Sequence, residues 1–225
     1  MAVPVQITGP GGSGKGFSIK TCDPKKTFLI DADGKGPAWA GGRADYNEAN
    51  KNYYKTSDAT KILSLLKGIS NSRPDIEVII VDTINTIMSD KEMSERKKPG
   101  YNKWLDLAGE IYDMYSEIPS LRDDLIVVFM AHSMLENPKD PDSKVITKTN
   151  GAMLTKLNLM SRLNYNLYTY VEPGDGEKPG LYYFITQSDG NNECRSTYGV
   201  LDYKMPNDLG AVVTAIRTKD LGLAA

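Results

Sequence analysis

The sequence predicts one α/β domain over residues 1–225, with a mainly parallel central sheet flanked by helices and an antiparallel hairpin at one edge. Apolar strand segments alternate with amphipathic helical segments along most of the chain, which is typical of a parallel sheet. Two later strand segments, 165–171 and 181–187, are joined by the turn sequence PGDG at 173–176, which indicates a hairpin. A chain of 225 residues has the length of a single domain with a sizeable core.

The expected elements follow one another in a regular order. Short apolar runs predict strands at 3–7, 27–30, 78–81 and 125–130, and the uninterrupted run at 78–81 is typical of a strand buried on both faces. Periodic apolar residues and turn signals predict helices at 16–21, 58–69, 102–118, 151–162 and 207–217. Asp58 and Asn207 are the expected caps of two of these helices. Residues 89–102, 134–150 and 189–199 are expected to be polar loops.

Composition restricts the environment and the partners of the chain. The formal net charge is −2, so any binding of nucleic acid has to come from local basic clusters. The two cysteines, Cys22 and Cys194, are too few for a disulfide framework, and no signal peptide is recognisable. No apolar run approaches the roughly 20 residues that span a bilayer. We therefore expect a cytoplasmic protein with no membrane partner.

A phosphate-binding loop of the Walker A type follows the first expected strand. Glycines recur from Gly9 to Gly14 and are followed by Lys15, which matches the pattern G-x-x-x-x-G-K. Glycines let consecutive backbone N–H groups surround an anion, and the lysine adds a positive charge that can reach the β- and γ-phosphates. The helix that follows would add its positive dipole end. The expected nucleotide-binding residues are Gly9, Pro10, Gly11, Gly12, Ser13, Gly14, Lys15, Gly16 and Phe17.

One position departs from this pattern. The residue after the lysine is normally Ser or Thr, whose hydroxyl coordinates Mg²⁺, but this chain has Gly16. The nearest hydroxyls, Ser13, Ser18 and Thr21, do not stand at the usual spacing. The loop therefore predicts nucleotide binding more firmly than nucleotide hydrolysis.

Three polar side chains follow buried strands, where the ligands of parallel sheets bind. Asp82, after four apolar residues, has the place of an acid that holds Mg²⁺. Asp33 is the candidate general base that orients a water molecule toward the γ-phosphate, and Asp31 is the neighbouring alternative. His132, the only histidine, could form a hydrogen bond to the γ-phosphate. A nucleotide and Mg²⁺ are therefore the expected cofactors.

Taken together, these motifs resemble the RecA-type recombinase core, a P-loop ATPase. FLIDAD at 28–33 resembles the family's strand ending in Asp-Ala-Glu, in which Glu is the catalytic base, so the resemblance gives that role to Asp33. VIIVDT at 78–83 resembles the strand of the Mg²⁺ site, and VVFMAH at 127–132 resembles the strand whose final Gln senses the γ-phosphate. TNGAML at 149–154 resembles the start of the helix after the second DNA-binding loop.

A core of this size, with Arg195 shortly before Tyr198-Gly199-Val200, is similar to the small phage-encoded RecA-like ATPases of the Sak group. That resemblance implies an ATPase for single-strand annealing and homologous recombination, located in the host cytoplasm. The implied partners are single-stranded DNA, further copies of the chain in a ring or filament, and a single-stranded-DNA-binding protein. Arg195 would then reach the ATP of a neighbouring subunit as an arginine finger.

The resemblance also assigns DNA-binding loops to 89–102 and 134–150, both of which are basic. Lysines and arginines there would neutralise phosphates, and a tyrosine could stack on a base. The residues are Lys91, Arg96, Lys97, Lys98, Tyr101, Lys144 and Lys148. The competing interpretation is that both segments are ordinary solvated surface loops.

Two other functions remain open at this point. The chain could be a nucleotide-gated DNA-binding or annealing protein with little turnover, because Gly16 supplies no hydroxyl. It could also be a small-molecule or nucleotide kinase, which uses a phosphate loop as well. A kinase usually needs an arginine-rich lid over the acceptor, and this chain has few arginines.

Overall fold

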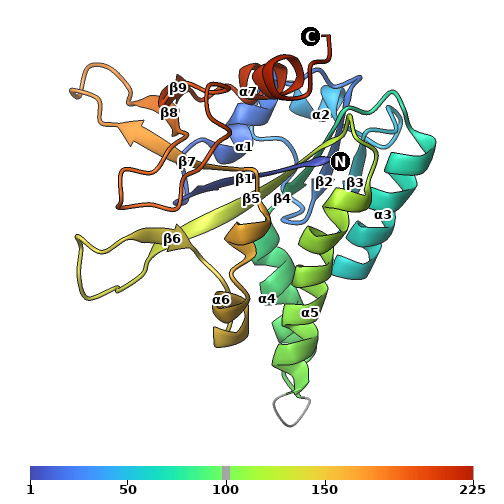
Figure 1. Cartoon of the computed structure of the whole chain (residues 1–225), viewed down its shortest axis with the longest axis horizontal. Helices are drawn as coiled ribbons and strands as arrows, with labels where there is room; N and C mark the ends of the chain where they lie inside the picture. Colours follow the sequence, from blue (N-terminus) through green and yellow to red (C-terminus); the bar gives the residue numbers. More distant parts are fainter. Residues whose placement is uncertain (98–101, 225) are drawn as a thin grey trace.

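The structure, a computed structural model that describes residues 1–97 and 102–224, confirms the predicted α/β architecture with a mostly parallel sheet and an antiparallel hairpin (Figure 1). The strand order is β3-β2-β4-β5-β1-β7-β8-β9, and β6 pairs with β5 beside this path. The strands are β1 Val3–Gly9, β2 Thr27–Asp31, β3 Tyr53–Lys55, β4 Val78–Asp82, β5 Ile126–Leu135, β6 Val145–Thr147, β7 Tyr165–Glu172, β8 Leu181–Ile185 and β9 Lys204–Pro206.

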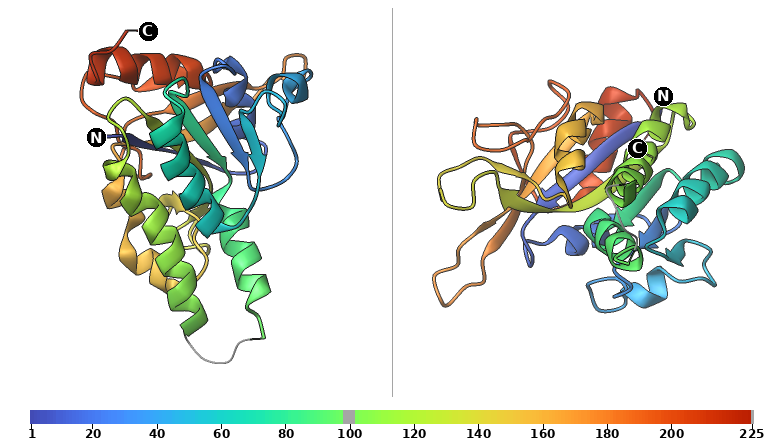
Figure 2. Two further views of the ribbon diagram at one scale, coloured as in Figure 1. Left: turned by 90° about the vertical axis from the view of Figure 1, so that its right-hand side faces the viewer. Right: turned by 90° about the horizontal axis from the view of Figure 1, so that it is seen from below.

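Helices cover both faces of this sheet (Figures 1 and 2). They are α1 Lys15–Ser18, α2 Gly42–Asp45, α3 Ala59–Ser72, α4 Ile84–Ser94, α5 Asn102–Glu117, α6 Ala152–Leu157 and α7 Leu209–Ala215. Helices α3, α4, α5 and α6 pack on one face, where their apolar residues meet side chains such as Ile79 and Phe129. Helix α7 covers the other face and meets Ile80 and Val128. Neighbouring residues of one strand thus contribute to two cores, which explains the uninterrupted apolar runs.

The strand register brings the ends of the central strands to one edge. Along the sheet order from β3 to β7, every pair of neighbouring strands is parallel. Gly9 at the end of β1 lies opposite His132 of β5, and Asp31 at the end of β2 lies opposite Asp82 of β4. Residues far apart in the sequence therefore gather at the carboxyl edge of the sheet, where ligands of such sheets bind.

Capping explains where two helices begin. The Asp58 carboxylate accepts a hydrogen bond from the backbone N–H of Lys61 (3.1 Å), which confirms the predicted cap of α3. The predicted cap of the last helix is wrong by one residue. The Asp208 side chain, not Asn207, accepts from the backbone N–H of Ala211 (2.8 Å).

Two segments expected to be loops contain regular structure. Helix α4 extends to Ser94, so the first half of 89–102 is helical. The buried residues Ile84, Ile87 and Met88 anchor this helix on the core. Within 134–150, β6 pairs antiparallel with the end of β5 and forms an arm that projects from the body (Figure 1). Strands β3 and β9 and the short helix α2 were not predicted.

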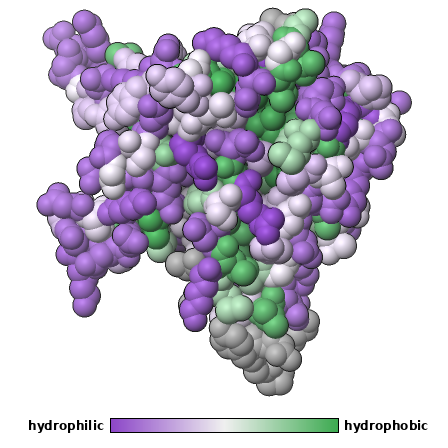
Figure 3. Space-filling model, viewed as in Figure 1, coloured by the Kyte–Doolittle hydropathy of each residue, from purple (hydrophilic) through white to green (hydrophobic). Residues whose placement is uncertain are grey.

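Hydrophilic residues dominate the face of the molecule shown in Figure 3. Across the two described ranges, no helix combines the length and the apolar character needed to cross a membrane.

Candidate functional site

The phosphate loop connects β1 to α1 and depends on glycine at several points. Gly12 (φ 75°) and Gly14 (φ 91°) adopt the left-handed backbone conformation that side chains disfavour. A Cβ atom at Gly9 would lie 1.7 Å from Oγ1 of Thr169 on β7, so only glycine fits there. The Ser13 hydroxyl also lies 2.5 Å from Thr169 Oγ1. The loop is therefore packed directly against β7.

Helix α1 is shorter than expected. Its four residues continue into a 3₁₀ turn at Ile19–Thr21, ahead of Pro24. A helix this short has a small dipole, so it adds little to anion binding. Lys15 therefore supplies the main positive charge of the loop.

Lys15 is buried and lies over the loop. Its Nζ donates hydrogen bonds to the carbonyl oxygens of Gly9 and Pro10, both at 2.7 Å. Burial lowers the pKa of Lys15 to about 8, although Asp82 and Asp33 act in the opposite direction. An anion seated on the loop would favour the charged form of this lysine.

Gly16 faces Asp82 across the site. A Cβ atom at Gly16 would lie 3.4 Å from Oδ2 of Asp82, so a hydroxyl at this position would lie beside the carboxylate. Burial, together with the negative charges of Asp33 and Asp31, raises the pKa of Asp82 to about 7. A divalent cation would offset this repulsion, and a carboxylate oxygen is a ligand that Mg²⁺ prefers. Asp82 therefore fits the role of the protein ligand of Mg²⁺.

Asp33 and Asp31 have different surroundings, which separates the two candidates for the general base. Asp33 lines the cavity and accepts hydrogen bonds from the hydroxyls of Thr83 (3.2 Å) and Thr86, and from Lys35 Nζ (2.7 Å). Burial favours its neutral form, but the hydrogen bonds from Lys35 and Thr86 outweigh this effect and lower the pKa of Asp33. Asp33 is thus ionised at neutral pH and reachable by a ligand.

Asp31, in contrast, is a structural residue of the loop that follows β2. Its carboxylate accepts hydrogen bonds from the backbone N–H groups of Gly34 and Gly36 and from the Tyr53 hydroxyl, all at 2.7 Å. It is buried and does not line the cavity. Asp31 therefore shapes the loop that presents Asp33.

His132 lies at the far wall of the cavity and is connected to residue 148. Its backbone N–H donates to Oδ1 of Asn85 (2.6 Å), and its carbonyl accepts from the backbone N–H of Lys148 (2.8 Å). The Asn85 amide in turn donates to the carbonyl of Lys148 (2.8 Å). Burial and the nearby Lys15 lower the pKa of His132, so the imidazole is neutral at pH 7. A neutral imidazole can donate one hydrogen bond and accept another.

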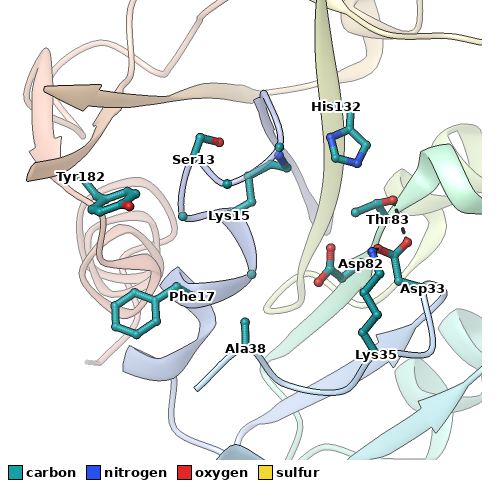
Figure 4. A pocket seen from close by; sticks show the side chains of 14 residues that line it. Ser13, Lys15, Phe17, Asp33, Lys35, Ala38, Asp82, Thr83, His132 and Tyr182 are labelled. Atoms are coloured by element: carbon teal, nitrogen blue, oxygen red, sulfur yellow. Dashed lines mark hydrogen bonds and ion pairs between the residues drawn. The ribbon is translucent and has the colours of Figure 1, made fainter. Parts of the chain in front are cut away.

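The phosphate loop, Asp82, Asp33 and His132 surround one cavity of about 590 Å³ at the carboxyl edge of the sheet (Figure 4). Sequence reasoning missed four of its lining residues, namely Lys35, Ala38, Thr83 and Tyr182. Lys35 and Thr83 could have been suspected because Lys35 lies two residues after Asp33 and Thr83 directly follows Asp82 in the chain. Tyr182 carried no such signal, because it reaches the loop from β8, more than 160 residues away in sequence.

Arg195 does not belong to this cavity. It is exposed, its backbone pairs with Asn166 of β7, and its guanidinium donates to the carbonyl of Met160 (3.3 Å). A role at the site of a neighbouring subunit stays a prediction.

The predicted DNA-binding residues fall into different environments. Lys91 is paired with Glu110 (2.6 Å) and Glu95 (3.1 Å), so its charge is already balanced. Arg96 and Lys97 are exposed beyond the end of α4. Lys98 and Tyr101 lie outside the described residues.

The second predicted DNA segment has its lysines on the projecting arm and at its base. Lys148 is exposed and Lys144 is half-buried. Because its backbone carbonyl and N–H bind Asn85 and His132, Lys148 is the predicted DNA contact most directly joined to the cavity.

Within residues 1–97 and 102–224, no group of three or more His, Cys, Asp and Glu side chains is arranged to hold a metal ion. A cation here would therefore depend on Asp82, water and the ligand itself. No protein-family model matches the chain, and no curated protein matches it. The role of the site has to be inferred from these side chains and their geometry.

Proposed function

We propose that this protein is an ATP-binding, RecA-like ATPase that acts on single-stranded DNA in strand annealing or homologous recombination, as the phage proteins it resembles do. One observation carries the proposal. A glycine-rich loop with a buried lysine, a carboxylate for Mg²⁺, a second ionised carboxylate and a neutral histidine line one cavity at the carboxyl edge of a parallel sheet. This arrangement meets the main requirements of phosphoryl transfer, which are positioning and charge stabilisation.

Each group has a distinct task in this proposal. The loop and Lys15 hold the phosphates, while Asp82 holds Mg²⁺ beside them. The low pKa of Asp33 makes it a weak base, so its main task is to orient the attacking water by a hydrogen bond. His132 contacts the γ-phosphate, and its link through Asn85 to Lys148 supports coupling to DNA.

The proposal is tested by ATP hydrolysis measured with and without single-stranded DNA over a series of salt concentrations. We expect DNA to stimulate turnover at low salt, and the stimulation to fall as salt rises, because phosphate contacts release counterions. Unchanged turnover together with no retention of DNA at low salt would reject the role in DNA metabolism.

Restoring the missing hydroxyl provides a sharper test of the site. Gly16→Ser is expected to raise Mg²⁺-dependent turnover by roughly tenfold, because its hydroxyl would lie beside Asp82 and could complete the Mg²⁺ coordination. The measurement is ATP hydrolysis over a Mg²⁺ titration. Gly16→Ala is the matched control, since it adds the Cβ atom without the hydroxyl. An equal gain in both variants would show that backbone restriction, not metal binding, is responsible.

The second candidate function is nucleotide-gated DNA binding with little turnover, and the glycine opposite Asp82 is the observation that favours it. It predicts that ATP alters DNA affinity while the wild-type protein hydrolyses ATP slowly. Rapid hydrolysis by wild-type protein that Lys15→Met abolishes would exclude it.

The lysines of the two predicted DNA loops are expected to differ in effect. Lys148→Ala should weaken binding of single-stranded DNA and reduce the slope of log K against log salt by about 0.7, the value for one lost phosphate contact. Lys91→Ala should leave both unchanged, because Glu110 and Glu95 already balance that charge. Fluorescence anisotropy of a labelled oligonucleotide measures both quantities. The reverse ranking would mean that DNA follows α4 instead of the arm.

A further inference from the structure

The cavity has two chemically different ends (Figure 4). On one side of the phosphate loop lie Asp33, Asp82 and His132, and on the other side lie Phe17 and Tyr182. The polar end suits Mg²⁺ and the terminal phosphate. The aromatic end lies where the base of a bound nucleotide would extend. A nucleotide would therefore bind with its phosphates at the polar end and its base at the aromatic end.

The two aromatic side chains at this end of the cavity are partly exposed. Phe17 is 48% exposed and Tyr182 is 43% exposed, and both line the cavity. They reach it from separate elements, α1 and β8. Planar aromatic faces beside a phosphate site favour stacking with a nucleobase, and such stacking does not require charge.

Tyr182 and a polar side chain, Asn207, both lie close to Gly14. A Cβ atom at Gly14 would lie 2.9 Å from Cδ1 of Tyr182 and 3.2 Å from Oδ1 of Asn207. The backbone N–H of Asn207 also donates to the carbonyl of Tyr182 (3.1 Å). The loop, the ring and the asparagine amide therefore meet at one point.

The side-chain amide of Asn207, beside Gly14 and Tyr182, has no apparent hydrogen-bonding role in the part of the fold that the structure describes. Its Nδ2 and Oδ1 atoms are both buried, and neither has a hydrogen-bond partner among the described residues. A buried donor and acceptor without partners is costly, and native proteins rarely leave both unpaired. The edge of adenine offers the matching acceptor and donor, N7 and the 6-amino group, and asparagine recognises adenine in this way.

We propose that Phe17, Tyr182 and Asn207 form a nucleobase subsite that selects adenine, which makes ATP the preferred ligand of the cavity. The base stacks on the aromatic side chains, and Asn207, which lies beside the lining residues Gly14 and Tyr182, pairs with the edge of the base. This inference rests on the proposed nucleotide binding, and it names the residues that read the base.

The test compares MgATP, MgGTP and inorganic tripolyphosphate by isothermal titration calorimetry. Tyr182→Leu is expected to weaken ATP binding roughly tenfold and to leave tripolyphosphate binding unchanged, while Tyr182→Phe retains the affinity for ATP. Asn207→Ala is expected to remove most of the preference for ATP over GTP. Tyr170→Leu is the matched control, because Tyr170 on β7 is 41% exposed and lies outside the cavity.

The outcomes separate this inference from the proposed function. If wild-type protein binds ATP no more tightly than tripolyphosphate, or if Tyr182→Leu weakens both ligands equally, the nucleobase subsite is rejected and the phosphate site stands. If wild-type protein binds none of the three ligands, the proposed function and the subsite both fall. Equal loss of ATP affinity in Tyr170→Leu and Tyr182→Leu would also reject the subsite.

Discussion

Replacing Lys15 with methionine is expected to weaken binding of MgATP by about 30- to 100-fold, which is the usual effect of losing a hydrogen bond to a charged group. Methionine keeps most of the side-chain volume but removes the charge that lies over the loop. It also removes the donor to the carbonyls of Gly9 and Pro10. Isothermal titration calorimetry with MgATP measures the loss.

The control is Lys25→Met, which removes the same charge from an exposed position before β2, at the opposite edge of the sheet. Thermal unfolding followed by circular dichroism should show that both variants remain folded. If Lys15→Met binds ATP as tightly as Lys25→Met does, the glycine-rich loop is only a turn and the proposed function fails.

Replacing Asp33 with asparagine is expected to reduce turnover by roughly 10²-fold, the lower end of the range for a lost general base, because Asp33 is a weak base that mainly orients water. ATP affinity should change only slightly. The amide oxygen can still accept hydrogen bonds from Thr83 and Thr86, so the loop should keep its shape. The charge that orients water is lost. Single-turnover hydrolysis and ATP binding, measured on the same preparation, separate the two effects.

Asp31→Asn is the companion variant, because it changes the neighbouring carboxylate in the same way. Asp31 accepts two backbone hydrogen bonds and one from Tyr53, so this variant should lower the melting temperature more than Asp33→Asn does. Its turnover should fall less. If Asp31→Asn removes turnover and Asp33→Asn does not, the roles of the two carboxylates are reversed.

The sequence allowed the sheet edge to be predicted because its signals are local. An apolar run followed by Gly9, Asp82 or His132 predicts both a buried strand and a polar group at its end. Parallel pairing then brings such ends together, whatever the strand order. The register of Gly9 with His132 is the physical basis of that success.

The remaining features depend on contacts that no local pattern carries. Asp31 and Asp33 both follow an apolar strand, and the sequence does not distinguish them. Only the folded loop, in which Tyr53 donates a hydrogen bond to Asp31, shows which carboxylate is held by the protein. The second half of helix α4 was mistaken for a loop because most of its residues are polar, while the buried apolar residues of the helix, Ile84, Ile87 and Met88, lie in its first two turns. Tyr182 became a cavity residue through the pairing of β7 with β8, which sequence spacing does not reveal.

The close approach of Thr169 to the phosphate loop sets a limit on how far this protein can be shortened. All the motifs that identify the cavity lie before residue 133, so a fragment ending there would look complete in sequence. It would lack the strand whose Thr169 hydroxyl lies 2.5 Å from Ser13 and against which Gly9 fits. The smallest part of the chain that can bind a phosphate therefore extends through β7. A phosphate loop grafted onto another scaffold would also need a strand in the position of β7 to pack against.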